Sequence, residues 1–78
     1  MSLKQKIIDG MKAVVETQKK IATEVHLTRS DEIDLLFLTR DEIGNAVFEI
    51  INGEKGPRGL PRLLGLKIVW DAEKFEVR

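Results

Sequence analysis

The spacing of the apolar residues changes along the first third of the chain, and this change constrains the fold more than any other feature of the sequence. From Leu3 to Val15 the apolar residues recur at steps of three and four, which places them on one face of a helix. From Ile21 to Thr28 they alternate with polar residues, which is typical of a strand with one buried face. The sequence therefore predicts an α+β fold.

Local signals indicate where the first helix begins and ends. Ser2 and Gln5 have the spacing of a capping box, in which each side chain bonds to the backbone of the other residue. Two lysines favour a helix end between Thr17 and Lys20. Gly10 lies inside this helix and costs about 1 kcal/mol relative to alanine. The helix therefore needs packing against the rest of the chain to be stable.

The stretch LTRSDEIDLLFLTRDEIG contains LTRSDEI and, eleven residues later, LTRDEI, which is the same run without the serine. Ser30 is a favourable N-cap, and the two acidic residues that follow it suit the positive end of a helix. Gly44 favours a helix end because it tolerates the left-handed conformation. We predict one helix from about Asp31 to Ile43. Its apolar stripe consists of Ile33, Leu36, Phe37 and Ile43.

Two features of this region have alternative interpretations. Thr39 and Glu42 also have capping-box spacing, so a break near Leu38 into two helices is the alternative to one helix. Ala46 to Ile51 is short, β-branched and contains an aromatic residue, which favours a strand. Continuation of the preceding helix to Ile51 is the alternative there.

The rest of the chain predicts a loop followed by a β-hairpin. Residues 52–62 hold three glycines and both prolines of the chain, and we predict a mobile loop. The C-terminal run LKIVWDAEKFEVR then predicts two strands joined by a turn from Asp71 to Lys74. This register places Trp70 opposite Phe75, and Ile68 opposite Val77. We therefore expect a small antiparallel sheet with helices on one face.

The length of 78 residues predicts a single small domain spanning residues 1–78. Such a short chain buries only about 60% of the surface that its unfolded form exposes, so its core is thin. The sequence contains no cysteine, so neither a disulfide nor a thiolate metal site can strengthen that core. Self-association is the usual remedy, and we expect a homo-oligomer.

Charge is balanced overall but unevenly distributed. Thirteen basic and thirteen acidic residues give a formal net charge of zero, which argues against a protein built mainly to grip nucleic acid. Residues 1–26 hold five basic and three acidic residues, residues 27–53 hold two and six, and residues 54–78 hold six and four. An acidic middle between basic flanks suits head-to-tail or self-complementary association.

The apolar runs are too short to span a bilayer, which needs roughly 20 residues. Charged residues interrupt the N-terminal apolar pattern, so it does not resemble a cleavable signal. We expect a cytoplasmic protein without a membrane partner.

Signals for catalysis or metal binding are weak. The single histidine, His26, shares a strand face with Glu24 and Thr28, but this spacing does not form a catalytic triad. The acidic residues from Asp31 to Glu42 do not converge as cation ligands and are better explained by helix capping. We predict no catalytic, cofactor-binding or metal site, no cofactor, and no enzymatic activity.

A basic loop is the main candidate for binding an anion or nucleic acid. The run from residue 55 to residue 67 has no acidic residue, and Gly56–Gly59 resembles the G-x-x-G loop of KH-type RNA-binding domains. However, Pro57 lacks an amide donor, and the loop offers no aromatic side chain for base stacking. The candidate contact residues are Lys55, Arg58, Arg62 and Lys67.

The order of these signals resembles that of a group of phage proteins. From Val25 to Val77, a strand and a capped helix precede a loop, the run LLGLKIVWD and a turn to FEV. This arrangement resembles short proteins encoded by tailed bacteriophages and prophages, several of which are virion structural or assembly proteins. The resemblance implies a phage structural partner and a location in the virion or cytoplasm. The function expected from it is structural or interactive, through self-association, with nucleic-acid binding as the alternative.

Overall fold

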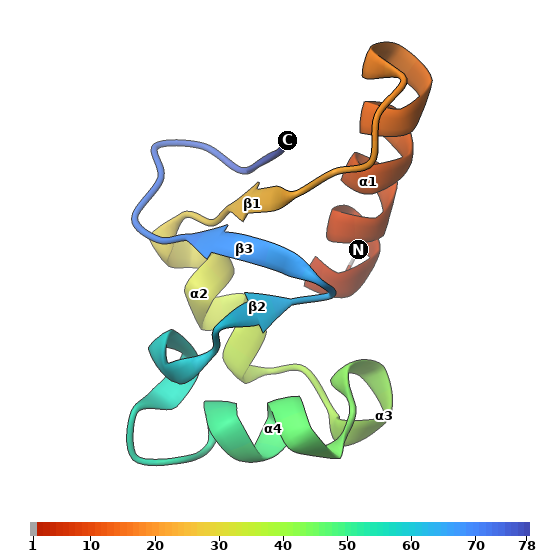
Figure 1. Cartoon of the computed structure of the whole chain (residues 1–78). Helices are drawn as coiled ribbons and strands as arrows, with labels where there is room; N and C mark the ends of the chain where they lie inside the picture. The colour runs from red at the N-terminus through yellow and green to blue at the C-terminus, as the bar shows by residue number, and fades with distance from the viewer. Residues whose placement is uncertain (1) are drawn as a thin grey trace.

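Four strands form one small mixed sheet, and helices pack against it (Figure 1). The computed structural model describes residues 2–78. Across the sheet the strands follow the order β2 (Arg62–Leu63), β3 (Leu66–Val69), β1 (Glu24–His26) and β4 (Glu76–Val77). The predicted α+β class is confirmed. The helices are α1 (Leu3–Gln18), α2 (Arg29–Leu36), α3 (Arg40–Ile43), α4 (Asn45–Ile51) and the 3-10 helix η1 (Gly56–Gly59).

Helix α1 begins and ends where the sequence predicts. The Ser2 hydroxyl accepts a hydrogen bond of 3.2 Å from the Gln5 amide, and Lys19 ends the helix in the left-handed conformation. The apolar stripe is wider than the face that becomes buried. Val15 remains exposed, and Ile8 is only half-buried. The core residues from this helix are Leu3, Ile7 and Val14.

Strand β1 is shorter than the predicted strand, which began at Ile21. Ile21 is exposed in the connection from α1, whereas Val25 and Leu27 are completely buried. Hydrogen bonding to the neighbouring strands sets the start of β1, because the amide of Glu24 donates to the Arg78 carbonyl at 3.0 Å.

The predicted C-terminal hairpin is wrong, because β1 lies between β3 and β4. Val25 pairs in parallel with Ile68 and in antiparallel with Val77, so Ile68 and Val77 are not direct neighbours. The sheet is consequently mixed rather than antiparallel. The segment between β3 and β4 passes over the end of β1, where the Ala72 amide donates to the Leu27 carbonyl at 3.0 Å. The alternation on β3 and β4 was correct, but it does not reveal which strand separates them.

The hairpin of this sheet joins β2 and β3 instead. Leu63 pairs with Leu66 in antiparallel register. The two residues between them, Leu64 and Gly65, both have positive φ angles, of 52° and 82°. This is the turn geometry that matches the twist of a tight hairpin.

The repeated hexapeptide forms the starts of two separate helices, so the single predicted helix is wrong and the alternative is confirmed. The N-cap of α2 is Thr28 rather than Ser30, and the N-cap of α3 is Thr39. The Asp31 carboxylate accepts from the Thr28 amide at 3.0 Å, and the Glu42 carboxylate accepts from the Thr39 amide at 2.9 Å. Each copy of the repeat is therefore a capping device.

Residues 46–51, expected to form a strand, belong to helix α4. Gly44 has a φ of 83°, so α4 is a new helix rather than a continuation of α3. Ile51 packs into the core from one face of this helix, and Val47 packs against the core from the same face. Tertiary packing thus overrides the β-propensity of a short β-branched run.

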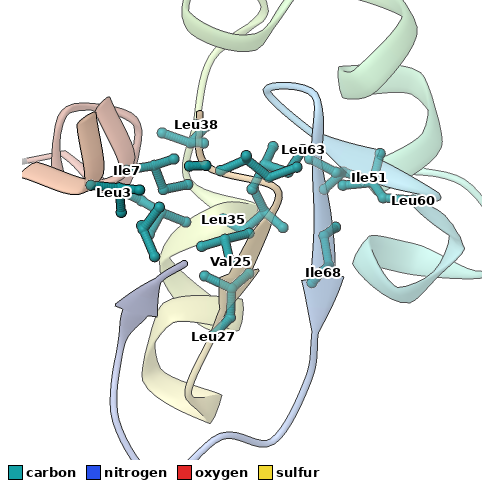
Figure 2. Close-up of a cluster of buried hydrophobic side chains, with 14 residues drawn as sticks. Leu3, Ile7, Val25, Leu27, Leu35, Leu38, Ile51, Leu60, Leu63 and Ile68 are labelled. Carbon is teal, nitrogen blue, oxygen red and sulfur yellow. The ribbon is translucent and has the colours of Figure 1, made fainter. Parts of the chain in front are cut away.

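The core lies between the helices and one face of the sheet (Figure 2). Val25, Leu66 and Ile68 point into it from the strands, and Leu35 points into it from α2. Helix α1 approaches β4 so closely that a Cβ atom at Gly10 would lie 2.5 Å from Val77 Cγ2. Apart from Val69, the opposite face of the sheet carries polar side chains, as expected for helices on one face.

Candidate functional site

The four basic candidates lie at different places on the surface. Arg62 and Lys67 are register partners on β2 and β3, and both are exposed. Lys55 is exposed immediately before η1, which occupies the middle of the predicted loop. The fourth candidate, Arg58, is held by carboxylates of the same chain.

Arg58 connects three elements that are distant in sequence. Its guanidinium donates to the Glu32 carboxylate at 2.9 Å and 3.1 Å. It also donates to the Asp71 carboxylate at 2.7 Å and 3.1 Å, and lies 5.4 Å from the Trp70 ring centroid. Asp71, followed by Glu32, raises the pKa of Arg58. This guanidinium acts as an internal cross-link, and four of its five N–H donors are already occupied.

A hollow of about 480 Å³ lies beside the polar face of the sheet. His26 lines it, and its Nε2 atom is 2.9 Å from Glu24 Oε1. The hydrogen bond from His26 lowers the pKa of Glu24. The hydroxyl of Thr28, the potential nucleophile nearest in sequence, donates instead to Asp31 at 2.9 Å. The sequence placed these three residues on one strand face, but the structure directs Thr28 into the cap of α2.

The acidic residues do not form a cation site within residues 2–78, where no group of three potential ligands could hold a metal. Asp31 is buried and binds Lys6 Nζ at 3.0 Å, and Glu42 caps α3. Hydrogen bonds from the Thr39 amide and hydroxyl lower the pKa of Glu42. These carboxylates serve the helix starts, as the sequence indicated, although Asp31 is not solvated.

The exposed side of α2 carries a cluster of large apolar side chains. Ile33, Leu36 and Phe37 are 56%, 48% and 78% exposed, and we call these three residues the α2 patch. The sequence placed these three residues and Ile43 on one helical stripe. The first three share one face, but Ile43 belongs to α3 and packs against the core. The stripe that enters the core is a different one, formed by Leu35 and Leu38. The i, i+3 spacing of those two leucines could have indicated that α2 is apolar on two faces.

The α2 patch borders a groove. The Phe37 amide donates to the carbonyls of Asp34 and Leu35, which fixes the residue at the helix end. A groove of about 320 Å³ runs between α2 and η1. It is lined by Arg29, Glu32, Ile33, Leu36, Pro57, Arg58 and Asp71. An apolar surface with charged residues at its rim is typical of a protein contact.

No described helix, from residue 2 to residue 78, has the length and apolarity needed to cross a membrane. Comparisons with protein-family models, with curated proteins and with solved structures found no match.

Proposed function

We propose that this chain is a small non-enzymatic interaction protein that works through self-association, with the α2 patch as a contact surface. The observation that carries the proposal is the exposure of Ile33, Leu36 and Phe37 on one face of α2. Burying a side chain of this size contributes about 1.5 to 3 kcal/mol. Three neighbouring side chains can therefore support a specific contact.

Two further features support this proposal. Leu35 and Leu38 bury the opposite side of α2 in the core, and a helix that is apolar on both sides is normally covered on both sides. The resemblance of residues 25–77 to small phage structural and assembly proteins implies the same kind of role. A virion component or a cytoplasmic assembly protein fits both features.

The test is the mass of the protein in solution as a function of concentration. We expect the wild-type protein to form oligomers at micromolar concentration in analytical ultracentrifugation. Phe37→Glu places a charge in the α2 patch and should weaken the association at least tenfold. Ala46→Glu is the matched control, because it adds the same charge at an exposed position on α4. A wild-type protein that remains monomeric at high micromolar concentration would refute the proposal.

A further inference from the structure

Asn52 and Gly53 form a chemically labile pair at the end of α4. Where asparagine precedes glycine, the glycine backbone nitrogen can attack the asparagine side-chain amide, because glycine has no side chain to obstruct the approach. The sequence contains two asparagines. Asn52 precedes a glycine, whereas Asn45 precedes Ala46. The side chain of Asn52 is exposed to water, which the second step of this reaction consumes.

The reaction balances with water as the co-reactant. A bond forms between Gly53 N and Asn52 Cγ, while the bond between Asn52 Cγ and Nδ2 breaks. The released nitrogen leaves as ammonia and takes the proton of the Gly53 amide, so that a cyclic imide remains. Water then opens one of the two imide carbonyls, which gives aspartate or isoaspartate at position 52.

Both reacting groups are engaged with other partners in the folded chain. Asn52 Nδ2 donates a hydrogen bond to the Phe48 carbonyl at 3.0 Å, and the Gly53 amide donates to the Ile50 carbonyl at 3.1 Å. To close the imide ring, the Gly53 nitrogen must lose the proton that it donates and approach Asn52 Cγ. Both hydrogen bonds therefore have to break before the attack.

The residues on either side hold this turn in place. Ile51, directly before Asn52, is only 3% exposed and belongs to the core. The Gly53 carbonyl, directly after Asn52, accepts from the Gly56 amide at 3.1 Å, where the chain enters η1 (Figure 1). Opening the last turn of α4 consequently disturbs contacts on both sides of the reacting pair.

We propose that Asn52 is a site of spontaneous deamidation, which the fold keeps closed and which reacts when the last turn of α4 opens. The rate in the folded protein is then the rate in the unfolded chain multiplied by the fraction of molecules in which this turn is open. Because two hydrogen bonds hold the reacting groups, this fraction is about one tenth or less.

Deamidation also changes the end of α4. The carboxylate of the product has no N–H to donate to the Phe48 carbonyl. It also places a negative charge at the end of the helix where the free carbonyls already carry partial negative charge. The product therefore cannot rebuild the closed turn, and the modification leaves this end of α4 loosened.

Deamidation rates at the two asparagines test this proposal. The protein is incubated at mildly alkaline pH in native buffer and in concentrated urea, and each asparagine is followed by peptide mass. In urea Asn52 should react much faster than Asn45, because the methyl group of Ala46 obstructs the attack. In native buffer Asn52 should react at least about tenfold more slowly than in urea. Circular dichroism checks that the chain is folded in buffer and unfolded in urea.

Two results would overturn the proposal. Equal rates at Asn52 in buffer and in urea would show that the fold does not protect the pair. An Asn52 that reacts no faster than Asn45 in urea would refute the site itself.

Two charge-matched variants test the structural consequence. Asn52→Asp introduces the carboxylate of the product, and Asn45→Asp makes the same change at the exposed beginning of α4. The measurement is the protection of the Gly53 amide against hydrogen exchange, relative to unstructured peptides of the same sequences. Protection should fall several-fold in Asn52→Asp and stay at the wild-type level in Asn45→Asp. Unchanged protection in Asn52→Asp, or an equal loss in both variants, would refute the idea that the Asn52 amide holds the turn closed.

Discussion

Asp31 shows how one side chain can serve both a helix start and the core. It is only 2% exposed, yet its carboxylate accepts hydrogen bonds from the Thr28 amide and hydroxyl and from Lys6 Nζ. Burial disfavours ionisation, but these hydrogen bonds outweigh that effect and lower the pKa of Asp31. A capping residue on α2 therefore also joins α2 to α1.

The stability supplied by Asp31 should depend on pH. Because the pKa of its carboxyl is lower in the folded state than in the unfolded state, its contribution is complete well above the unfolded value and is lost as the pH falls through the folded value. Asp31→Asn should reduce the free energy of unfolding by about 1 to 3 kcal/mol at neutral pH, with a smaller difference at about pH 3. Urea denaturation at both pH values measures this. Asp34→Asn, at an exposed position of the same helix, should change it by less than about 0.5 kcal/mol.

At the scale of elements, the repeated sequence works as two helix starts separated by one short turn. In both copies the threonine three residues before the acidic residue is the N-cap. The second copy contains Arg40, which pairs with Glu49 of α4 at 2.8 Å. The repeat therefore controls where the chain turns rather than forming a pair of equivalent binding sites.

The position of the cap on α2 can be tested by comparing two alanine substitutions. Thr28→Ala removes the hydroxyl that accepts from the Asp31 amide at 3.2 Å, and should cost about 1 kcal/mol in the free energy of unfolding. Ser30→Ala alters an exposed residue inside the first turn and should cost far less. Denaturant titration of both variants measures the difference. A larger loss for Ser30→Ala would place the cap at the position that the sequence alone favoured.

At the scale of the whole molecule, α1 packs on the sheet through a glycine. Gly10 lowers the intrinsic stability of α1, but it lets the helix backbone approach Val77 on β4. Strand β4 is in turn held by β1, because the Arg78 amide donates to the Glu24 carbonyl at 2.9 Å. The first helix and the last strand of the chain are thus in close contact at Gly10 and Val77.

This close contact predicts an unusual response to Gly10→Ala. In an exposed helix the substitution stabilises by about 1 kcal/mol, but here the added methyl collides with Val77 and should destabilise the protein by about 1 to 3 kcal/mol. In a Val77→Ala background the 2.5 Å contact with Cγ2 is removed and only the 3.0 Å contact with Cβ remains, so the same substitution should cost much less. A double-mutant cycle of thermal or urea unfolding measures this coupling. Additive effects would contradict the proposed contact.

The sequence by itself determined the features that depend on neighbours within about one helical turn. The start and end of α1, the α+β class and the capping role of the acidic residues all follow from local spacing, and so does the alternative of two helices at the repeat. Local signals were insufficient where two residues suited the same N-cap position, or where one segment suited two kinds of secondary structure, almost equally well. Thr28 and Ser30 both suit an N-cap, and residues 46–51 suit either a strand or a helix.

Only the tertiary structure decided which strands pair and which apolar faces stay uncovered. Val25 separates Ile68 from Val77 although more than 40 residues lie between it and either partner in the chain. The carboxylates that bind Arg58 are 26 and 13 residues away, so the sequence left this side chain as a free basic candidate. Phe37 is exposed because Leu35 and Leu38, on the other side of the helix, are the residues that enter the core. The physical reason is common to all three: a local pattern specifies that a side chain should be buried or paired, but the partner is set by the packing of distant segments.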